Sequence, residues 1–223
     1  MRRPDTAARR VLAAYAEAGR GARLHTAIRW ATCPFPAVEA LIPERGRILD
    51  LGCGHGHFSI YLALKSPDRD VLGVDIDAHK IEVGTRVVHQ AGLESRVELM
   101  AIGDDWDPTV ESFDAVVTND VLYLMGRRRA EAVLAGMAAA VNADGVVVVK
   151  EMGLTPRWKH QINEVQERVA TKVLGITAGS ELEVLTPQQI EGPLAAAGLR
   201  LDRHELHRGY LHPHLAVVGT RRT

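Results

Sequence analysis

The chain has 223 residues, of which 46% are hydrophobic and 25% are charged, and its formal net charge is −1. A chain of this length and composition can bury one full hydrophobic core, so we expect one main domain. A net charge so close to zero gives no general attraction to nucleic acid or to an acidic membrane surface, which argues against nucleic acid as a partner.

The two cysteines, Cys33 and Cys53, lie far apart and form no Cys-x-x-Cys pair. This spacing does not indicate a disulfide framework or a structural zinc site, and we expect no metal. The short apolar run at residues 11–16 is interrupted by Glu17, and no later run approaches the length of a membrane span. We therefore expect no transmembrane segment and a cytoplasmic protein.

Residues 1–36 are predicted to form a helical appendage to a main domain at residues 37–223. Apolar residues recur at helical spacing over 7–15 and again over 24–30, which predicts two short helices before Cys33-Pro34. The segment is basic, with Arg2, Arg3, Arg9, Arg10, Arg20, Arg23 and Arg29. These side chains are expected on a solvated helix face; the alternative is a lid over an acceptor or a grip on an anionic carrier or lipid.

From Arg47 onward, short apolar runs alternate with helical patterns, which indicates repeated βαβ units and a doubly wound α/β fold. The runs at 71–74, 97–102, 113–118 and 146–149 are predicted strands. Helices are expected at 57–65, from Asp77 to Gly92, and over the apolar face at 133–141. Four consecutive valines at 146–149 favour a strand that is covered on both faces, after a turn at Asp144-Gly145.

The last part of the chain is predicted to add one inserted helix and one final αβ unit. Residues 156–174 have a helical pattern and precede Thr186-Pro187-Gln188-Gln189, which is typical of a capped helix start. That helix is expected to end at Gly198. Two closing strands, near 199–206 and 215–220, would flank a turn rich in histidine.

The stretch from Arg47 to Gly56 combines a buried strand, a loop with glycines at 52, 54 and 56, and a following helix. Glycine permits positive φ angles and lets a ligand approach the bare backbone. The unpaired N–H groups at a helix start favour a partner with negative charge or lone pairs. A dinucleotide fingerprint would need its third glycine one residue later, where His57 stands, so the pattern indicates another nucleotide-like ligand.

The run from Leu49 to Gly56, Leu-Asp-Leu-Gly-Cys-Gly-His-Gly, resembles the first motif of the class I S-adenosylmethionine-dependent methyltransferases. The resemblance covers residues 47–151 by motif and the remainder by the order of elements. It implies a Rossmann-like, seven-stranded sheet whose last strand runs antiparallel, with S-adenosylmethionine as the cofactor and S-adenosylhomocysteine as its product.

The resemblance places the cofactor-binding residues in the glycine loop and after the following strands: Asp50, Gly52, Cys53, Gly54, Gly56, Asp75, Ile76, Asp104, Asp105, Trp106 and Asn119. A carboxylate at position 75, at the end of the second strand, can accept hydrogen bonds from both ribose hydroxyls. The alternative for Asp75 is an ordinary turn carboxylate. Ile76 would pack on the adenine, and Asp50 would hold the methionine end together with the backbone of Gly52 and Asn119.

Three of these assignments have open alternatives. Either Asp104 or its neighbour Asp105 matches the acidic residue that accepts a hydrogen bond from the adenine amino group. Trp106 either stacks near the purine or belongs to the core or its rim. Cys53 is interpreted as a small residue that fills the loop rather than as a nucleophile.

The expected reaction is in-line transfer of the sulfonium methyl group to a small-molecule, lipid or carrier-bound acceptor. Family members that methylate amino groups of adenine or glutamine have an Asn/Asp-Pro-Pro-Tyr type of motif after the fourth strand, whereas this chain has Asn-Asp-Val-Leu-Tyr at 119–123. The pattern resembles the small-molecule branch. Two alternatives are a catalytically silent cofactor-binding subunit and an aminopropyl-type transferase on the same fold, and a homodimer is left open.

The turn between the closing strands is the candidate acceptor side, because it should lie at the carboxyl ends of the parallel strands. We expect Tyr210 and His212 to orient the acceptor and take its proton, followed by His160 and Tyr123. The alternatives are an ordinary hydrogen-bonded turn and a metal site built from the histidines around it, although the turn offers no carboxylate or thiol spacing that favours a metal.

Overall fold

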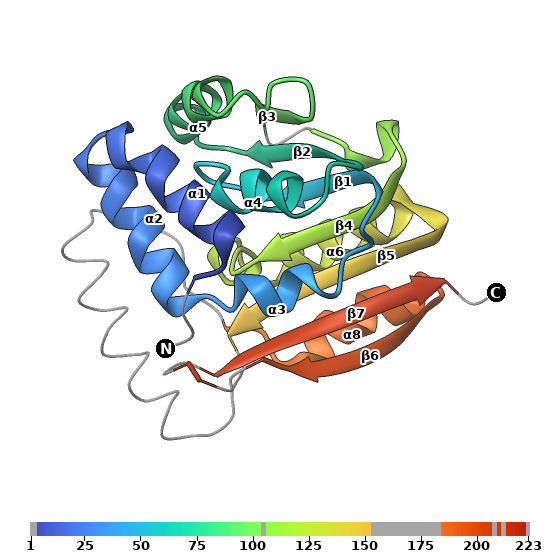
Figure 1. Cartoon of the computed structure of the whole chain (residues 1–223). Helices are drawn as coiled ribbons and strands as arrows, with labels where there is room; N and C mark the ends of the chain where they lie inside the picture. The colour runs from blue at the N-terminus through green and yellow to red at the C-terminus, as the bar shows by residue number, and fades with distance from the viewer. Residues whose placement is uncertain (1–3, 104–105, 153–183, 207–208, 211–212, 222–223) are drawn as a thin grey trace.

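Seven strands form one mixed sheet in the order β3-β2-β1-β4-β5-β7-β6 (Figure 1). The computed structural model describes residues 4–103, 106–152, 184–206, 209–210 and 213–221. The strands are β1 Gly46–Leu51, β2 Arg69–Asp75, β3 Val97–Ala101, β4 Phe113–Asn119, β5 Val141–Met152, β6 Leu199–Glu205 and β7 His214–Arg221. Only β7 runs antiparallel to its neighbours, β5 and β6, so the predicted seven-stranded Rossmann-like fold with an antiparallel last strand is confirmed.

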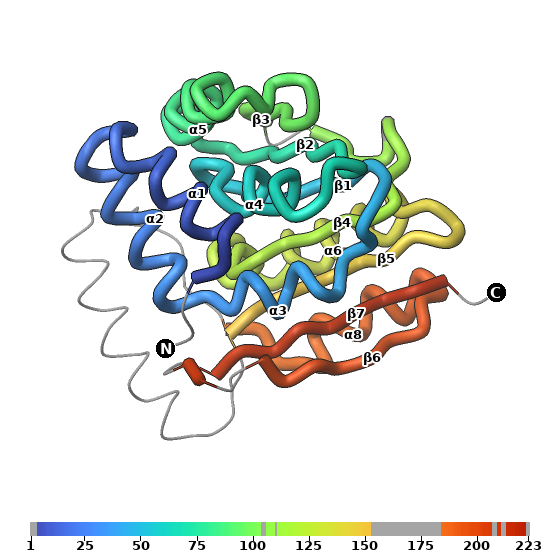
Figure 2. The backbone as a smooth tube through the Cα atoms, viewed as in Figure 1, coloured from blue at the N-terminus to red at the C-terminus, as the bar shows by residue number. Residues whose placement is uncertain are grey.

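Helices cover both faces of the sheet (Figure 2). The described helices are α1 Thr6–Ala14, α2 Arg20–Thr32, α3 Phe35–Glu39, α4 His57–Lys65, α5 Ala78–Gln90, α6 Arg127–Ala140 and α8 Pro187–Ala196. Short 3-10 turns occur at η1 Tyr15–Glu17, η2 Pro108–Val110 and η3 Leu122–Leu124. Residues of α1, α3, α4 and α5 share one core cluster, and residues of α6 and α8 share the cluster on the opposite face.

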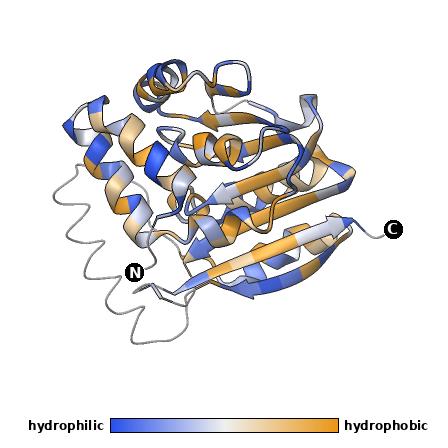
Figure 3. Ribbon diagram, viewed as in Figure 1, coloured by the Kyte–Doolittle hydropathy of each residue, from blue (hydrophilic) through white to orange (hydrophobic). Residues whose placement is uncertain are grey.

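The central strands are hydrophobic along their length because both of their faces are covered. Ile48 and Leu49, neighbours in β1, are both fully buried and belong to opposite clusters. The valines at 146–149 divide in the same way, with Val148 in the first cluster and Val149 in the second. Figure 3 shows the hydrophobic centre of β4, β5 and β7, whereas the edge strand β6 carries more hydrophilic residues.

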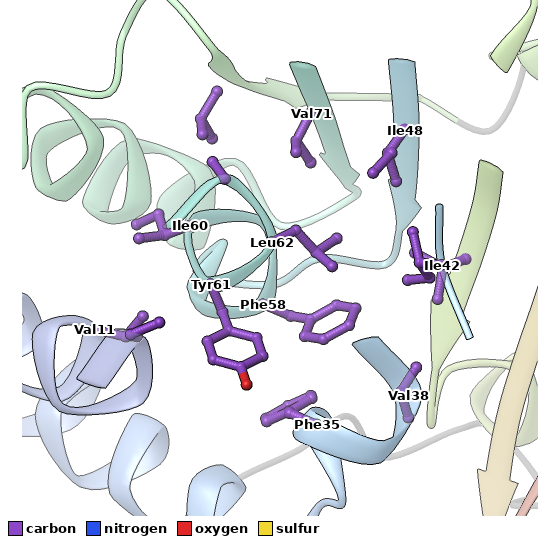
Figure 4. Packing of buried hydrophobic residues seen from close by; sticks show 14 of the residues in the cluster. Val11, Phe35, Val38, Ile42, Ile48, Phe58, Ile60, Tyr61, Leu62 and Val71 are labelled. Atoms are coloured by element: carbon purple, nitrogen blue, oxygen red, sulfur yellow. The ribbon is translucent and has the colours of Figure 1, made fainter. Parts of the chain in front are cut away.

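Helix α4 is the centre of the first cluster (Figure 4). Its Phe58, Ile60 and Leu62 are at most 2% exposed and lie between the sheet and helices α1 and α3. Each such side chain contributes roughly 1.5–3 kcal/mol when it leaves water. The ring of Phe35, from α3, stacks on Phe58 with the centroids 5.0 Å apart. The N-terminal segment therefore belongs to the same hydrophobic core as the glycine loop's helix.

Local signals predicted several helix boundaries correctly. Helix α4 begins at His57 and ends at Lys65 as expected. Asp77 caps α5 by accepting a hydrogen bond from the Lys80 N–H. Thr186 and Gln189 form the expected capping box at the start of α8. In each case the sequence signal is confined to one turn of helix, so it does not depend on distant residues.

Three features differ from the sequence prediction or lie beyond it. The predicted turn at Asp144-Gly145 is wrong, because both residues belong to β5, which begins directly after α6 at Val141. The register of β4 against β5 shifts between Phe113 and Ala115, which accommodates the irregular first residues of β5. Helix α3 was not predicted and crosses the expected domain boundary after residue 36. The predicted helix at 156–174 lies outside the described residues.

Among the described residues, no helix has the length and apolar character needed to cross a membrane.

Candidate functional site

The glycine loop between β1 and α4 has all three of its glycines at positive φ: 76° at Gly52, 58° at Gly54 and 76° at Gly56. An added Cβ would lie 2.4 Å from Val121 at position 52 and 2.5 Å from Leu99 at position 56. At Gly54 the nearest atom, in Lys80, would be 4.0 Å away. The outer glycines are therefore required by packing, whereas the middle one leaves its backbone open to a ligand.

Cys53 lies between these glycines and is 5% exposed. Burial raises the pKa of its thiol well above the usual value, with the nearby Asp50 and Asp75 charges acting in the same direction. A thiol that keeps its proton is a poor nucleophile. This environment suits the interpretation of Cys53 as a small residue that fills the loop.

Asp75 ends β2 and lies beside the middle of the glycine loop. Its Oδ2 accepts a hydrogen bond from the Gly54 N–H at 2.8 Å, and its Oδ1 accepts one from the Asp77 N–H at 2.9 Å. The next residue, Ile76, is 69% exposed, the largest value among the exposed large hydrophobic residues that the structure describes. A partly exposed carboxylate and an exposed apolar side chain thus follow one another beside the open glycine.

Asp50, at the end of β1, is 2% exposed. Its Oδ2 accepts a hydrogen bond from the Ser59 hydroxyl at 2.7 Å. Burial raises the pKa of Asp50 to about 7, and the charge of Asp75 adds to the rise. Within the described part of the chain, no cationic side chain forms an ion pair with Asp50, so this buried acid has only a neutral hydrogen-bond partner.

The neighbouring strand β4 ends in two polar residues with no partner for their side chains. The Thr118 hydroxyl and both amide atoms of Asn119 are buried and form no hydrogen bond among the described residues. A buried amide without a partner costs free energy, on the order of 1–3 kcal/mol. Asn119 therefore has the hydrogen-bonding capacity of a site that a ligand would complete.

Asp120 follows Asn119 and, among the described residues other than glycine, is the one with a positive φ, 56°. This conformation costs an ordinary residue roughly 1–2 kcal/mol. The Asp120 carboxylate is held by Lys150 Nζ, at 2.5 and 2.6 Å from its two oxygens, and by Arg29 Nη1 at 2.9 Å. Burial alone would raise the pKa of Asp120, but the charges of Lys150 and Arg29 hold it below its usual value.

Glu151 fixes the backbone that follows Asp120. Its Oε1 accepts hydrogen bonds from the Val121 N–H at 3.0 Å and the Leu122 N–H at 2.9 Å. Burial raises the pKa of Glu151 to about 8, and the negative charge of Asp120 adds to the rise. Tyr123, a predicted acceptor residue, lies half-buried in the adjoining turn η3.

The N-terminal helices contact the glycine loop directly. The Tyr15 hydroxyl donates a hydrogen bond to the carbonyl oxygen of His55, within the loop. The ring of His25, on α2, lies 5.0 Å from the ring of His55 and 5.8 Å from that of His57. Burial lowers the pKa of His25 to about 4, helped by His55 and Arg29, and burial also lowers the pKa of His55 and of His57.

The end of β6 at Glu205 and the start of β7 at His214 lie at the same edge of the sheet as the glycine loop. His214 at the start of β7 is opposite Met152 at the end of β5, and Asn119 at the end of β4 is opposite Lys150. Tyr210 packs edge-on against His214 with ring centroids 5.5 Å apart. The structure thus brings Tyr210 and Tyr123 to the edge that holds Asp50, Asp75 and Asn119, as we expected from the strand order.

The remaining predicted residues are placed differently or are not described. Trp106 is partly buried and packs against the second core cluster, which suits the core alternative. Asp104, Asp105, His160 and His212 lie outside the described residues. In the part of the chain that the structure describes, no group of three or more His, Cys, Asp or Glu side chains could hold a metal ion. An open depression of about 440 Å³ is lined by residues 125–129 and Ala132, none of which is a predicted site residue.

The ion-pair cluster of Arg29, Asp120 and Lys150 at this edge is not apparent from the sequence. Arg29 was expected on a solvated helix face, which is wrong, since its guanidinium contacts Asp120 and its side chain is 24% exposed. Lys150 is fully buried. The available signal was a lysine directly after four buried valines, because a lysine in such a position needs an acidic partner.

Comparison with known proteins identifies relatives of this fold and loop. A family model described as a methyltransferase domain matches residues 43–198. Trans-aconitate 2-methyltransferase of Deinococcus radiodurans is 28% identical over 164 residues, which are 70% of this chain and 60% of that enzyme. The matched regions span between 21% and 60% of the length of these curated relatives.

Solved structures of low sequence identity share the fold. An O-methyltransferase family protein from Burkholderia thailandensis superposes with a TM-score of 0.70 at 20% identity, covering 92% of this chain and 60% of that one. The O-methyltransferase NcsB1 from neocarzinostatin biosynthesis, in complex with S-adenosylhomocysteine and 1,4-dihydroxy-2-naphthoic acid, has a TM-score of 0.67 at 19% identity, with coverages of 89% and 56%.

Proposed function

This chain belongs to the methyltransferase-domain family, and we propose that it transfers a methyl group from S-adenosylmethionine to a small-molecule, lipid or carrier-bound acceptor. One observation carries the proposal: the Asp75 carboxylate is hydrogen-bonded to the N–H of Gly54, the loop glycine that leaves its backbone open. A carboxylate and an accessible backbone side by side at the strand ends are what a nucleoside needs.

The polar groups at this edge fit the three parts of the cofactor. Each carboxylate oxygen can accept more than one hydrogen bond, so Asp75 can bind the ribose hydroxyls while it keeps its backbone partners. The exposed Ile76 offers an apolar surface to the adenine. Asp50, which has no cationic partner among the described residues, and the Asn119 amide would bind the ammonium and carboxylate of the methionine end.

The bound cofactor supplies a methyl group that is already activated by the sulfonium charge. The chain's own residues then need to align the acceptor with that methyl group and exclude water. The N-terminal helices would exclude water by covering the site. They contact the glycine loop through Tyr15 and the end of β4 through Arg29. This assigns residues 1–36 the role of a cover over the site.

A small acceptor is supported by two relatives. The Deinococcus radiodurans relative is named for methylation of trans-aconitate, and NcsB1 was solved with a hydroxylated naphthoic acid. On the acceptor side we propose Tyr210 and His212, then His160 and Tyr123. A phenol or neutral imidazole there can orient an acceptor oxygen and take its proton near neutral pH. A homodimer stays a prediction that light scattering would test.

The acceptor side is tested by the substitution Tyr210→Phe, which removes the hydroxyl and keeps the ring against His214. We expect turnover to fall at least tenfold while affinity for S-adenosylhomocysteine stays unchanged. Full turnover in this variant would remove Tyr210 from the acceptor site. Tyr61→Phe is the matched control, because the Tyr61 hydroxyl contacts Asp5, which is not among the residues proposed for the site.

The function itself is tested by calorimetry and mass spectrometry. The chain should bind S-adenosylhomocysteine and give no heat with NAD, whereas a catalytically silent subunit need not bind the product. Cell extract incubated with the chain and S-adenosylmethionine should contain a product heavier by one methyl group. A gain of an aminopropyl group from the decarboxylated cofactor would instead favour the aminopropyl-type transferase. Binding without any new product would favour the silent subunit.

A further inference from the structure

The side chain of Arg29 joins helix α2 to the end of β4. Arg29 donates from Nη1 to the Asp120 carboxylate at 2.9 Å and from Nη2 to the backbone oxygen of Asn119 at 3.4 Å. The second contact joins the helix to the residue whose buried amide has no partner. Arg29 thus connects helix α2 to the end of β4, beside the contacts that Tyr15 and His25 make with the glycine loop.

The carboxylate that Arg29 contacts is buried, with 7% of its side chain exposed, and its other cation, Lys150, is fully buried. The backbone reinforces the same connection, since the Asp120 N–H donates to the Lys150 carbonyl oxygen at 2.9 Å. Removal of either cation would leave charge in a low-dielectric environment. The cluster is therefore a fixed junction between α2, β4 and β5.

The conformation of Asp120 decides where the next residue lies. With φ at 56°, the chain turns sharply after β4, and the Val121 side chain comes to rest over Gly52. This contact is so close that a Cβ on Gly52 would lie 2.4 Å from Val121 Cγ2. The contacts therefore form a continuous series from Arg29 through Asp120 and Val121 to the first glycine of the cofactor loop.

We infer that Arg29 is a positioning residue for cofactor binding. By holding Asp120 in its turned conformation, Arg29 keeps the Val121 side chain against Gly52 and keeps Asn119 in place. Docking of α2 is thereby coupled to occupancy of the cofactor site. The inference depends on the cofactor site proposed above. Because coupling between two sites is reciprocal, cofactor binding must also stabilise the docked position of α2.

Substitution of Arg29 separates this role from a general contribution to stability. We expect Arg29→Met to weaken S-adenosylhomocysteine binding at least tenfold in calorimetry. Arg29→Lys keeps the positive charge toward Asp120, so it should restore affinity to within threefold of the unsubstituted chain. Arg23→Met is the matched control on the same helix, since Arg23 is exposed, and it should leave the affinity unchanged.

Hydrogen exchange with the unsubstituted chain supplies a measurement that does not depend on any variant. S-adenosylhomocysteine should slow amide exchange along α2 but not along α8, which packs on the opposite face. In Arg29→Met the ligand should no longer slow exchange in α2. Circular dichroism would establish that the variant is folded.

Two results would overturn the inference: a folded Arg29→Met variant that binds S-adenosylhomocysteine as tightly as Arg23→Met, or exchange in α2 that does not respond to the ligand in the unsubstituted chain. If the unsubstituted chain did not bind S-adenosylhomocysteine at all, the proposed cofactor site would be wrong instead. The two failures are therefore distinguishable.

Discussion

The ends of β1 and β4 lie side by side in the sheet, and each carries a buried aspartate, but the two carboxyl groups have opposite surroundings. Asp50, on β1, has the Ser59 hydroxyl as its partner, and burial raises its pKa to about 7. Asp120, after β4, has Lys150 and Arg29, whose charges overcome burial and lower its pKa. Similar burial thus gives one acid that is half-protonated near neutrality and one that stays ionised.

The carboxyl group of Asp50 can therefore still bind a cation, whereas that of Asp120 is already neutralised by Lys150 and Arg29. The cations of Asp120 are side chains of the protein itself. Their ion pairs form what we call the framework cluster, Arg29, Asp120 and Lys150, which joins α2, β4 and β5. At the end of β1, burial disfavours the ionised form of Asp50, and a bound cation would stabilise it. The α-ammonium group of the cofactor's methionine end is the cation that we propose for it, whereas Asp120 has no such need.

The largest expected effect is a loss of stability when the framework cluster is disrupted. Lys150→Met removes the nearest cation of Asp120 and leaves a buried carboxylate partly uncompensated, which should lower the free energy of unfolding by about 3–5 kcal/mol. Denaturant unfolding followed by circular dichroism measures this. Lys65→Met is the control, because Lys65 forms partly exposed ion pairs with Asp5 and Glu39, and its loss should cost at most about 1 kcal/mol. Equal losses in the two variants would contradict the framework role of the Asp120 cluster.

On the binding side, Asp75→Ala should have the next largest effect. It removes the acceptor proposed for both ribose hydroxyls, so affinity for S-adenosylhomocysteine should fall by roughly 2–4 kcal/mol, with the fold intact. Calorimetric titration measures the change. Asp70→Ala, an exposed position on the same strand β2, should leave affinity unaltered. Unchanged binding by Asp75→Ala would remove this residue from the cofactor site.

A pair of glycine substitutions distinguishes backbone strain from loss of ligand space. Gly54 and Gly92 have similar φ angles, 58° and 64°, and a Cβ at either position would meet no atom closer than about 4 Å in the protein. Gly54→Ala and Gly92→Ala should therefore each cost roughly 1–2 kcal/mol of stability. Only Gly54→Ala should also weaken S-adenosylhomocysteine binding, by about tenfold or more (about 1.4 kcal/mol). Parallel losses of affinity would show that the loop glycine acts through stability alone.

The residues around the glycine loop are easier to recognise in the sequence than the ion-pair cluster of Asp120, for a physical reason. Glycines at 52, 54 and 56, the acid at 75 and the capping residues Asp77 and Thr186 act within a few residues of their own position, so their pattern is visible along the chain. The strand order followed from the alternation of strands and helices and from the family resemblance.

The framework cluster was not predicted because its members meet only in the folded chain. Arg29 and Asp120 are separated by 91 residues, and Asp120 and Lys150 by 30. Helical periodicity alone places Arg29 on a polar face without saying what covers that face. The positive φ of Asp120 likewise could not be predicted, because the residue at this position is not a glycine. The buried Lys150 was the one local sign that an acidic partner existed.

The most direct test of the contrast between Asp50 and Asp120 is the number of protons released when S-adenosylhomocysteine binds, measured by calorimetry in buffers of different ionisation enthalpy. With the pKa of Asp50 at about 7, its carboxyl group is mostly protonated at pH 6 and mostly ionised at pH 8. Because an ammonium group favours the ionised form, binding at pH 6 should release close to one proton, and affinity should rise about tenfold between pH 6 and pH 8. Both effects should disappear in Asp50→Asn, which separates them from any titration of Glu151, whose pKa is about 8. Binding that releases no proton at pH 6 and has the same affinity at both pH values would contradict the assignment of Asp50 as the acid left for the cofactor.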